Sequence, residues 1–219
     1  DVIIENFRPR VKHRLGIDYE SLKKTNPRLV YASISGFGQE GPYKDRPGLD
    51  QVVQGMGGLM SITGIPGQGP VRAGIEVSDS TAGLYLSFGI VLALLEREHS
   101  GEGQWVHTSL LQGLIALLDF QAARWTIGKE VAPQAGNDHP TAMPTGVYQS
   151  SVGYFSIADS RKRFERLCDA LEMPEIAKHP DYEGHNNRAK NRVALNAEIN
   201  KRTVKKTSAE WIEILNKAG

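Results

Sequence analysis

The stretch EVSDSTAGLYLSFGIVLALLERE, residues 76–98, decides how this chain folds. Its residues from Thr81 to Leu95 are almost all apolar or small, and charged residues return only at its end. Such a segment is typical of a helix that is buried in a core and apolar nearly all round. A carboxylate, Asp79, stands where this helix is predicted to begin, and its presence there needs a reason.

Two interpretations of Asp79 are open. Ser78, Asp79 and Ser80 are residue types that cap helix starts, because their side chains accept hydrogen bonds from backbone N–H groups. The structural interpretation is therefore an N-cap. The functional interpretation is that a helix start favours a charged carboxylate, and that an ionised carboxylate at the edge of a core can act as a nucleophile.

The composition is that of a soluble globular protein with one large domain or two small ones. The 219 residues are 40% hydrophobic and 23% charged, and the formal net charge is +1. This charge gives no reason to expect nucleic acid or an anionic membrane as a partner. Cys168 is the single cysteine and cannot form an internal disulfide, so we expect a cytoplasmic protein.

The longest apolar run is also too short to suggest a membrane span. It covers residues 84–95, which is 12 residues, whereas a bilayer needs about 20. The sequence opens as a buried-type strand without a starting Met and stops directly after a predicted helix. We therefore expect the central part of a longer protein.

Strand and helix signals alternate along the first half of the chain. Strands are predicted at residues 1–5, 29–35 and 104–110, and helices at residues 18–26, 49–64, 81–95 and 110–128. This alternation predicts an α/β fold with a Rossmann-like parallel sheet covered by helices. Residues 1–128 are expected to form this large domain.

The composition changes after Gly128. Residues 129–146 hold three prolines and no periodicity, which predicts a linker or functional loop. Residues 147–219 are expected to form a smaller α+β domain. Its predicted elements are a hairpin at 146–150 and 153–158 and helices near 161–171, 187–200 and 207–217, the last with Glu210 placed for a capping interaction.

Two familiar motifs fail in context. GFGQEG, residues 36–41, fits G-x-G-x-x-G, but Pro42 and Pro47 follow it where a dinucleotide fingerprint needs a helix. The six histidines show no H-E-x-x-H spacing and no partner cysteines, so no metal site is expected.

A basic cluster follows the first predicted strand and comprises Asn6, Arg8, Arg10, Lys12 and Arg14. Ligands of open α/β sheets bind beyond the carboxyl ends of strands, and arginines there can hold phosphates bidentately. A solvent-facing turn and helix would show the same composition. Both interpretations stay open at this point.

Several segments, in this order and spacing, resemble the class III CoA-transferases, also called the CaiB/BaiF family. They are ENFRP (5–9), RLGIDYESLKKTNPRLVYASISGFGQEGP (14–42), RPGLDQVVQGMGGLMSITG (46–64), SDSTAGLYLSFGIVLALLERE (78–98), SGEGQWVHTSLLQG (100–113) and GNDHPT (136–141). The resemblance implies a CoA-transferase that uses acyl-CoA and a small carboxylic acid and has no prosthetic group. It also implies an interlocked homodimer and chain segments before and after this one.

By this resemblance Asp79 matches the catalytic aspartate, which attacks an acyl-CoA thioester to form a mixed anhydride on the protein. We expect the helix start to keep this carboxylate charged.

The resemblance also implies positions that contact CoA or substrate. Asn6, Phe7, Arg8 and Arg14 match the CoA pocket, Gly48, Leu49 and Asp50 match the loop over its pantetheine and phosphate region, and Gly136, Asn137, Asp138 and His139 match a loop that reaches the active site from the small domain. Leu49 stands where an aromatic residue is frequent, and Arg10 replaces a common glycine.

Two alternatives remain. An α-methylacyl-CoA racemase resembles this fold but needs a base such as a histidine, which residues 36–50 lack. A non-catalytic CoA-binding protein would keep the fold, but Asp79 speaks against it.

Overall fold

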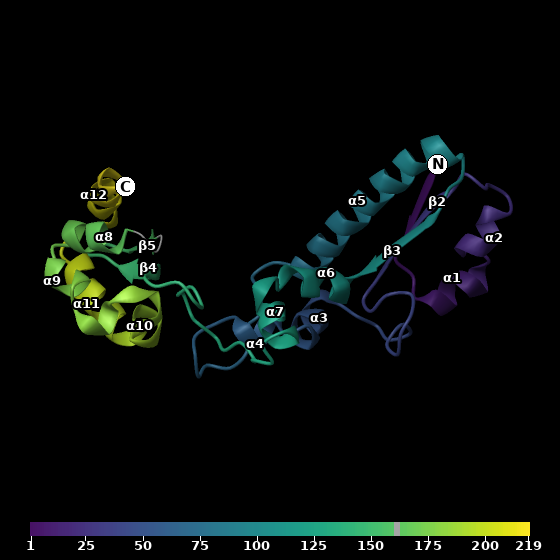
Figure 1. Cartoon of the computed structure of the whole chain (residues 1–219). Helices are drawn as coiled ribbons and strands as arrows, with labels where there is room; N and C mark the ends of the chain where they lie inside the picture. Colours follow the sequence, from purple (N-terminus) through teal and green to yellow (C-terminus); the bar gives the residue numbers. More distant parts are fainter. Residues whose placement is uncertain (160–162) are drawn as a thin grey trace. The chain divides into compact units, whose positions relative to one another are not determined.

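The computed structural model describes residues 1–159 and 163–219. The chain divides into two compact units, residues 1–134 and residues 135–219, which are described separately below (Figure 1). The division falls within the proline-containing segment 129–146.

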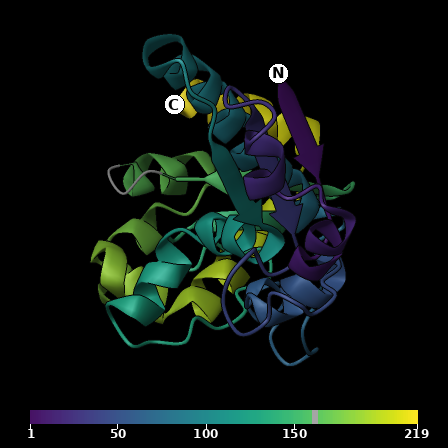
Figure 2. The same cartoon turned by 90° about the vertical axis from the view of Figure 1, so that its right-hand side faces the viewer.

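Unit 1 is built on a three-stranded parallel sheet in the order β1-β2-β3. The strands are β1 (Val2–Glu5), β2 (Val30–Ser35) and β3 (Trp105–Ser109). The predicted parallel sheet is thereby confirmed, and β1 lies at its edge (Figure 2).

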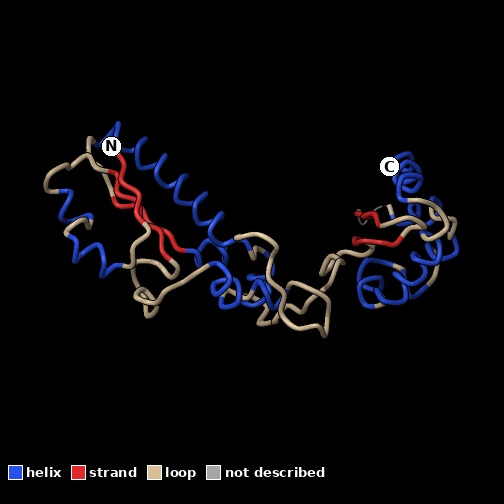
Figure 3. Tube along the Cα trace, turned by 180° about the vertical axis from the view of Figure 1, so that it is seen from behind, coloured by secondary structure: helices blue, strands red, loops and turns tan. Residues whose placement is uncertain are grey.

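Different helices cover the two faces of this sheet. Helix α5 (Val77–Ser100) runs along one face, and α1 (Pro9–Leu15) and α2 (Tyr19–Lys23) lie on the other (Figures 1 and 3). Ile34 of β2 packs in one apolar cluster with Ala82 of α5. Tyr31 instead packs against Tyr19 of α2, with ring centroids 6.1 Å apart. Alternate side chains of β2 thus serve opposite faces.

Helix α5 is less buried than predicted. Leu86 and Ala93 are buried, but Leu84, Phe88 and Val91 are exposed at 73%, 65% and 60%. The expectation of a helix covered nearly all round is wrong for this chain, because the sheet covers one side only. By length and composition α5 could also cross a bilayer, a test that the core helix of a soluble protein passes equally.

Two predicted long helices are interrupted. The segment 49–64 forms α3 (Asp50–Met56) and α4 (Leu59–Ile62), and the segment 110–128 forms α6 (Leu110–Leu117) and α7 (Phe120–Thr126). Gly57 ends α3 where a Cβ would lie 2.6 Å from the Leu114 side chain, and Gly58 turns at φ 90°. Asp119, at φ 46°, separates α6 from α7. The helical periodicity of apolar residues continues across such breaks and therefore does not predict them.

Unit 2 contains the predicted hairpin, formed by β4 (Thr145–Gln149) and β5 (Tyr154–Ala158). Its helices are α8 (Phe164–Ala170), α9 (Pro174–Ala177), the short 3-10 helix η1 (Pro180–Tyr182), α10 (Gly184–Lys190), α11 (Arg192–Thr203) and α12 (Ser208–Ala218). The helix predicted at 187–200 is two helices that meet at Asn191, and the first residues of the one predicted at 161–171 lie outside the described residues. The capping interaction predicted at the start of α12 is confirmed, since Thr207 and Glu210 form a reciprocal capping box.

Candidate functional site

A cavity of about 250 Å³ lies at the carboxyl ends of the strands of unit 1. It is lined by Asn6, Ile34, Ser35, Gly36, Gly48, Leu49, Asp79 and Leu110. Four residues that the resemblance selected from distant parts of the sequence, Asn6, Gly48, Leu49 and Asp79, therefore line one space. This edge of the sheet is where open α/β folds bind ligands.

Asp50 holds the start of α5 in place. Its Oδ1 accepts hydrogen bonds from the Ser78 backbone N, at 3.0 Å, and from the Ser78 Oγ, at 2.7 Å. Its Oδ2 accepts a hydrogen bond from Gln54 Nε2 at 2.7 Å. Because Asp50 and Ser78 are both buried, the first turn of α5 is fixed to α3. A CoA contact by Asp50 stays a prediction, but both of its carboxylate oxygens already have partners within the chain.

Asp79 is the residue after this anchor. Helix α5 begins at Val77 and its N-cap residue is Glu76, so Asp79 lies inside the first turn. The N-cap interpretation of Asp79 is therefore wrong. A partner 28 residues earlier in the sequence, Asp50, satisfies the N–H of Ser78 instead, which leaves the Asp79 carboxylate to the cavity.

The surroundings of Asp79 raise its pKa. Burial is the largest cause, followed by the negative charges of Asp50 and Glu76. This corrects the expectation that the helix start favours the charged form. The pKa of Asp50 is instead lowered: burial alone would raise it, but the hydrogen bonds from Ser78 and Gln54 and the charge of Arg72 more than offset that effect. A carboxylate with a raised pKa is the more basic nucleophile once it is ionised.

Two glycine backbones touch on the wall of the cavity. A Cβ on Gly36 would lie 2.5 Å from the Gly48 Cα, and a Cβ on Gly48 would lie 2.7 Å from the Gly36 Cα. No side chain fits between backbones at this distance. The sequence does not single out Gly36 as a site residue, because GFGQEG resembles a dinucleotide motif whose context fails.

A second cavity, of about 280 Å³, is lined by Arg8, Arg10, Val11, Arg14 and Asp45. Arg10 and Arg14 stand one helical turn apart on α1 and so share a face. Arg8 precedes α1 and donates a hydrogen bond to the Asp45 carbonyl oxygen at 3.3 Å. Three guanidinium groups around one hollow suit a ligand with several phosphates.

A single turn joins the two cavities. Asn6 lines the cavity of Asp79 and Arg8 lines the arginine cavity. Phe7 lies between them, and its backbone N donates a hydrogen bond to Glu5 Oε2 at 2.7 Å. Lys12 does not join the arginines, as the basic cluster suggested, because it is 1% exposed and faces the interior.

The predicted substrate loop, residues 136–139, belongs to unit 2. Asp138 accepts a hydrogen bond from Asn196 Nδ2 at 2.8 Å, and burial raises its pKa. His139 Nδ1 accepts a hydrogen bond from the Ala142 backbone N at 2.9 Å. These contacts shape the loop within its own unit. The role of Gly136, Asn137, Asp138 and His139 towards a substrate stays a prediction. Within residues 1–159 and 163–219, no group of three or more His, Cys, Asp or Glu could hold a metal ion.

The chain belongs to CoA-transferase family III, which it matches over residues 1–219. It is 39% identical over 221 residues to an acetyl-CoA:oxalate CoA-transferase of Acetobacter aceti, covering 100% of this chain and 57% of that protein. It is 39% identical over 206 residues to a succinate–glutarate CoA-transferase of Agrobacterium fabrum, covering 94% and 52%. The chain thus spans little more than half the length of these curated relatives.

Solved structures agree with this membership. A CaiB/BaiF family protein from Brucella suis matches with a TM-score of 0.85 and 37% identity, over 100% of this chain and 58% of that one. An orthorhombic crystal form of a protein from M. tuberculosis matches with a TM-score of 0.87 and 26% identity, over 100% and 57%. The resemblance expected from the sequence is confirmed.

The first prediction concerns the charge on Asp79. In Glu76→Gln we expect the pKa of the Asp79 carboxyl to fall, because one of the negative charges that disfavour its ionised form is gone. Carboxyl-carbon NMR of the full-length protein would measure it. Glu96→Gln, at the other end of α5, is the control and should leave this pKa where it was. If the pKa of Asp79 shifts equally in both variants, or does not shift in Glu76→Gln, then the charge of Glu76 does not raise this pKa.

Proposed function

We propose that this protein transfers CoA from an acyl-CoA thioester to a small carboxylic acid, with Asp79 as the nucleophile. The observation that carries the proposal is one turn, residues 6–8, that joins the Asp79 cavity to a cavity with three arginines. Acyl-CoA has a thioester at one end and phosphates at the other, and this pair of cavities suits both ends. The relatives whose names specify oxalate or glutarate as substrates support a carboxylic acid as acceptor.

The proposed transfer begins when a carboxylate oxygen of Asp79 attacks the thioester carbonyl carbon of the donor. The carbon–sulfur bond breaks, CoA leaves as a thiolate, and a mixed anhydride joins Asp79 to the acyl group. The thiolate then attacks the Asp79 carbonyl carbon, which releases the donor acid as a carboxylate and leaves an aspartyl-CoA thioester. The acceptor carboxylate runs the same two steps in reverse and leaves as the new acyl-CoA. The steps balance with no net uptake or release of a proton.

The chain's other residues serve binding in this proposal. Arg8, Arg10 and Arg14 hold CoA phosphates, and the turn at Asn6 leads the pantetheine arm towards Asp79. The backbones of Gly36 and Gly48 touch and carry no side chains, which leaves room in the Asp79 cavity for the pantetheine arm. Arg10 is an addition to the residues that the resemblance implied, because a glycine is common at its position.

Neither alternative function gains support from a specific observation. The described residues that line the Asp79 cavity include no histidine that could act as the base of a racemase. A non-catalytic CoA-binding protein would have no use for a carboxylate with a raised pKa at the cavity.

The nucleophile can be tested by removing it. We expect Asp79→Ala to lose transfer activity by at least about 1,000-fold, as removal of a covalent nucleophile does, while CoA still binds. In the parent, mass spectrometry after mixing with acyl-CoA should find a hydroxylamine-sensitive adduct on the Asp79 peptide. Glu96→Ala, on the same helix, should keep both activity and adduct. Transfer by Asp79→Ala within tenfold of the parent would refute the assignment.

The phosphate end can be tested separately. We expect Arg14→Ala to weaken CoA binding by about 1–3 kcal/mol, because a charge-assisted contact to phosphate is lost. Arg10→Ala should weaken it in the same direction, and both losses should shrink at high salt, where exposed charges are screened. Titration calorimetry measures the affinity, and Arg28→Ala, two residues before β2, is the control. An Arg14→Ala variant with the parent's CoA affinity would make these arginines a solvated surface.

We further propose an intimate homodimer as the native state. Its support in this chain is the apolar surface that α5 leaves uncovered, chiefly Leu84, Phe88, Val91 and Leu95, since exposed apolar patches of this kind mark interfaces. An interlocked dimer should bury far more than the standard interface of about 1,600 Å². Sedimentation of the full-length protein over a wide concentration range should find no folded monomer. A folded monomer at low concentration would contradict the proposal.

A further inference from the structure

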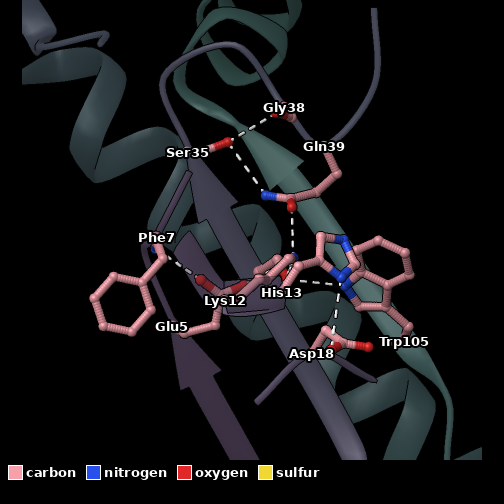
Figure 4. Close-up of polar contacts among 10 residues, drawn as sticks. Glu5, Phe7, Lys12, His13, Asp18, Ser35, Gly38, Gln39 and Trp105 are labelled. Carbon is pink, nitrogen blue, oxygen red and sulfur yellow. Dashed lines mark hydrogen bonds and ion pairs between the residues drawn. The ribbon is translucent and has the colours of Figure 1, made fainter. Parts of the chain in front are cut away.

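A buried lysine lies between the sheet and α1 in unit 1. The side chain of Lys12 is 1% exposed, and its Nζ donates three hydrogen bonds: to Glu5 Oε1 at 3.1 Å, to Ser33 Oγ at 3.1 Å and to Gln39 Oε1 at 2.5 Å. The ammonium also lies 4.6 Å from the centre of the Trp105 ring. Figure 4 shows Lys12 enclosed by Glu5, Gln39 and Trp105.

The parallel register brings these partners together. Glu5 of β1 pairs with Ser33 of β2, and Tyr31, two residues before Ser33, pairs with Trp105 of β3. Their side chains therefore project from the same face of the sheet. Trp105 Nε1 donates a hydrogen bond to Ser33 Oγ at 2.8 Å. The cluster thus has a partner for each ammonium hydrogen, which a buried charge requires.

One arm of the cluster reaches the turn between the two cavities. Glu5 receives Lys12 on Oε1 and the backbone N of Phe7 on Oε2. The residues on either side of Phe7 are Asn6, which lines the Asp79 cavity, and Arg8, which lines the arginine cavity. The conformation of this turn therefore depends on a carboxylate that Lys12 holds.

The other arm reaches a second part of the lining of the Asp79 cavity. Gln39 accepts from Lys12 on Oε1 and donates from Nε2 to Ser35 Oγ at 3.2 Å. Ser35 Oγ in turn donates to the Gly38 carbonyl oxygen at 3.1 Å. Ser35 and Gly36 line the cavity. One ammonium thus connects the turn at residues 5–8 to the loop at residues 35–39.

We propose that Lys12 is a positioning residue for acyl-CoA binding. It touches no substrate; it holds the 5–8 turn and the 35–39 loop at the separation that the pantetheine arm needs. A buried ion pair adds little net stability compared with uncharged residues of similar volume in place of both partners, so a core without charges at both position 5 and position 12 would fold without the pair. The inference rests on the proposed function, because it names a residue that prepares the same cavities.

Two variants separate positioning from stability. Lys12→Met removes the ammonium but leaves Glu5 as a buried charge without its lysine, so it should lower both thermal stability and CoA affinity. Glu5→Gln combined with Lys12→Met removes both charges, while the glutamine oxygen can still accept from the Phe7 N. We expect the double variant to regain most of the lost thermal stability and yet keep a KM for acyl-CoA raised about tenfold, with kcat within about threefold of the parent.

Lys24→Met is the matched control, since it makes the same substitution at an exposed lysine after α2 and should change neither thermal stability nor KM. Calorimetric CoA titration provides a second reading that does not depend on turnover. If the double variant regains the parent's stability together with its KM and CoA affinity, Lys12 is structural only and the inference is overturned. If the parent itself neither binds CoA nor transfers it, the proposed function fails instead, and the two failures are thereby distinguished.

Discussion

The hydrogen bonds from Ser78 to the buried carboxylate of Asp50 hold the helix start that carries Asp79. They fix the first turn of α5 to the start of α3, and Asp79 is the next residue in that turn. The two carboxylates divide the electrostatic roles. Hydrogen bonds and a nearby arginine lower the pKa of Asp50, so its contribution to stability is present at neutral pH and is lost as the pH falls through its folded-state pKa. The pKa of Asp79 is raised, so its ionisation opposes folding above the ordinary carboxyl pKa.

This division suits the role of nucleophile that we propose for Asp79. A carboxylate that stabilises its own fold has its lone pairs committed to donors, as Asp50 does. The ionisation of Asp79 instead costs stability, because its pKa is raised, and the neighbouring Ser78 makes the anchoring hydrogen bonds to Asp50. Functional groups in other proteins show the same trade between stability and reactivity.

The two faces of the sheet make different kinds of contact with the helices that cover them. Towards α5 the contacts are apolar, and Ile34, Ala82 of α5 and Leu114 of α6 share one cluster. Towards α1 the contacts are directional, because Lys12 has three hydrogen bonds whose partners must keep their places. The directional face is the one that continues into the turn at residues 6–8. A buried hydrogen-bond network whose members are all satisfied rigidifies the structure around it, and this one adjoins the turn that joins the two cavities.

The sequence by itself determined the alternation of strands and helices, because side-chain periodicity is a local property that each strand and helix displays in its own residues. It also determined the family, since the motifs around Asn6, Gly48 and Asp79 keep their order and spacing. Tertiary structure decided what lies against the end of α3, since a Cβ on Gly57 would meet the side chain of Leu114. Tertiary structure also placed Asp79 inside the first turn of α5 and not at its N-cap. The backbone N–H of Ser78 donates to Asp50, which lies 28 residues earlier in the sequence. Tertiary structure likewise separated Lys12 from the arginines beside it in sequence. A one-residue step along a helix turns a side chain by about 100°, and only the position of the sheet determines which of these cations faces water and which is buried.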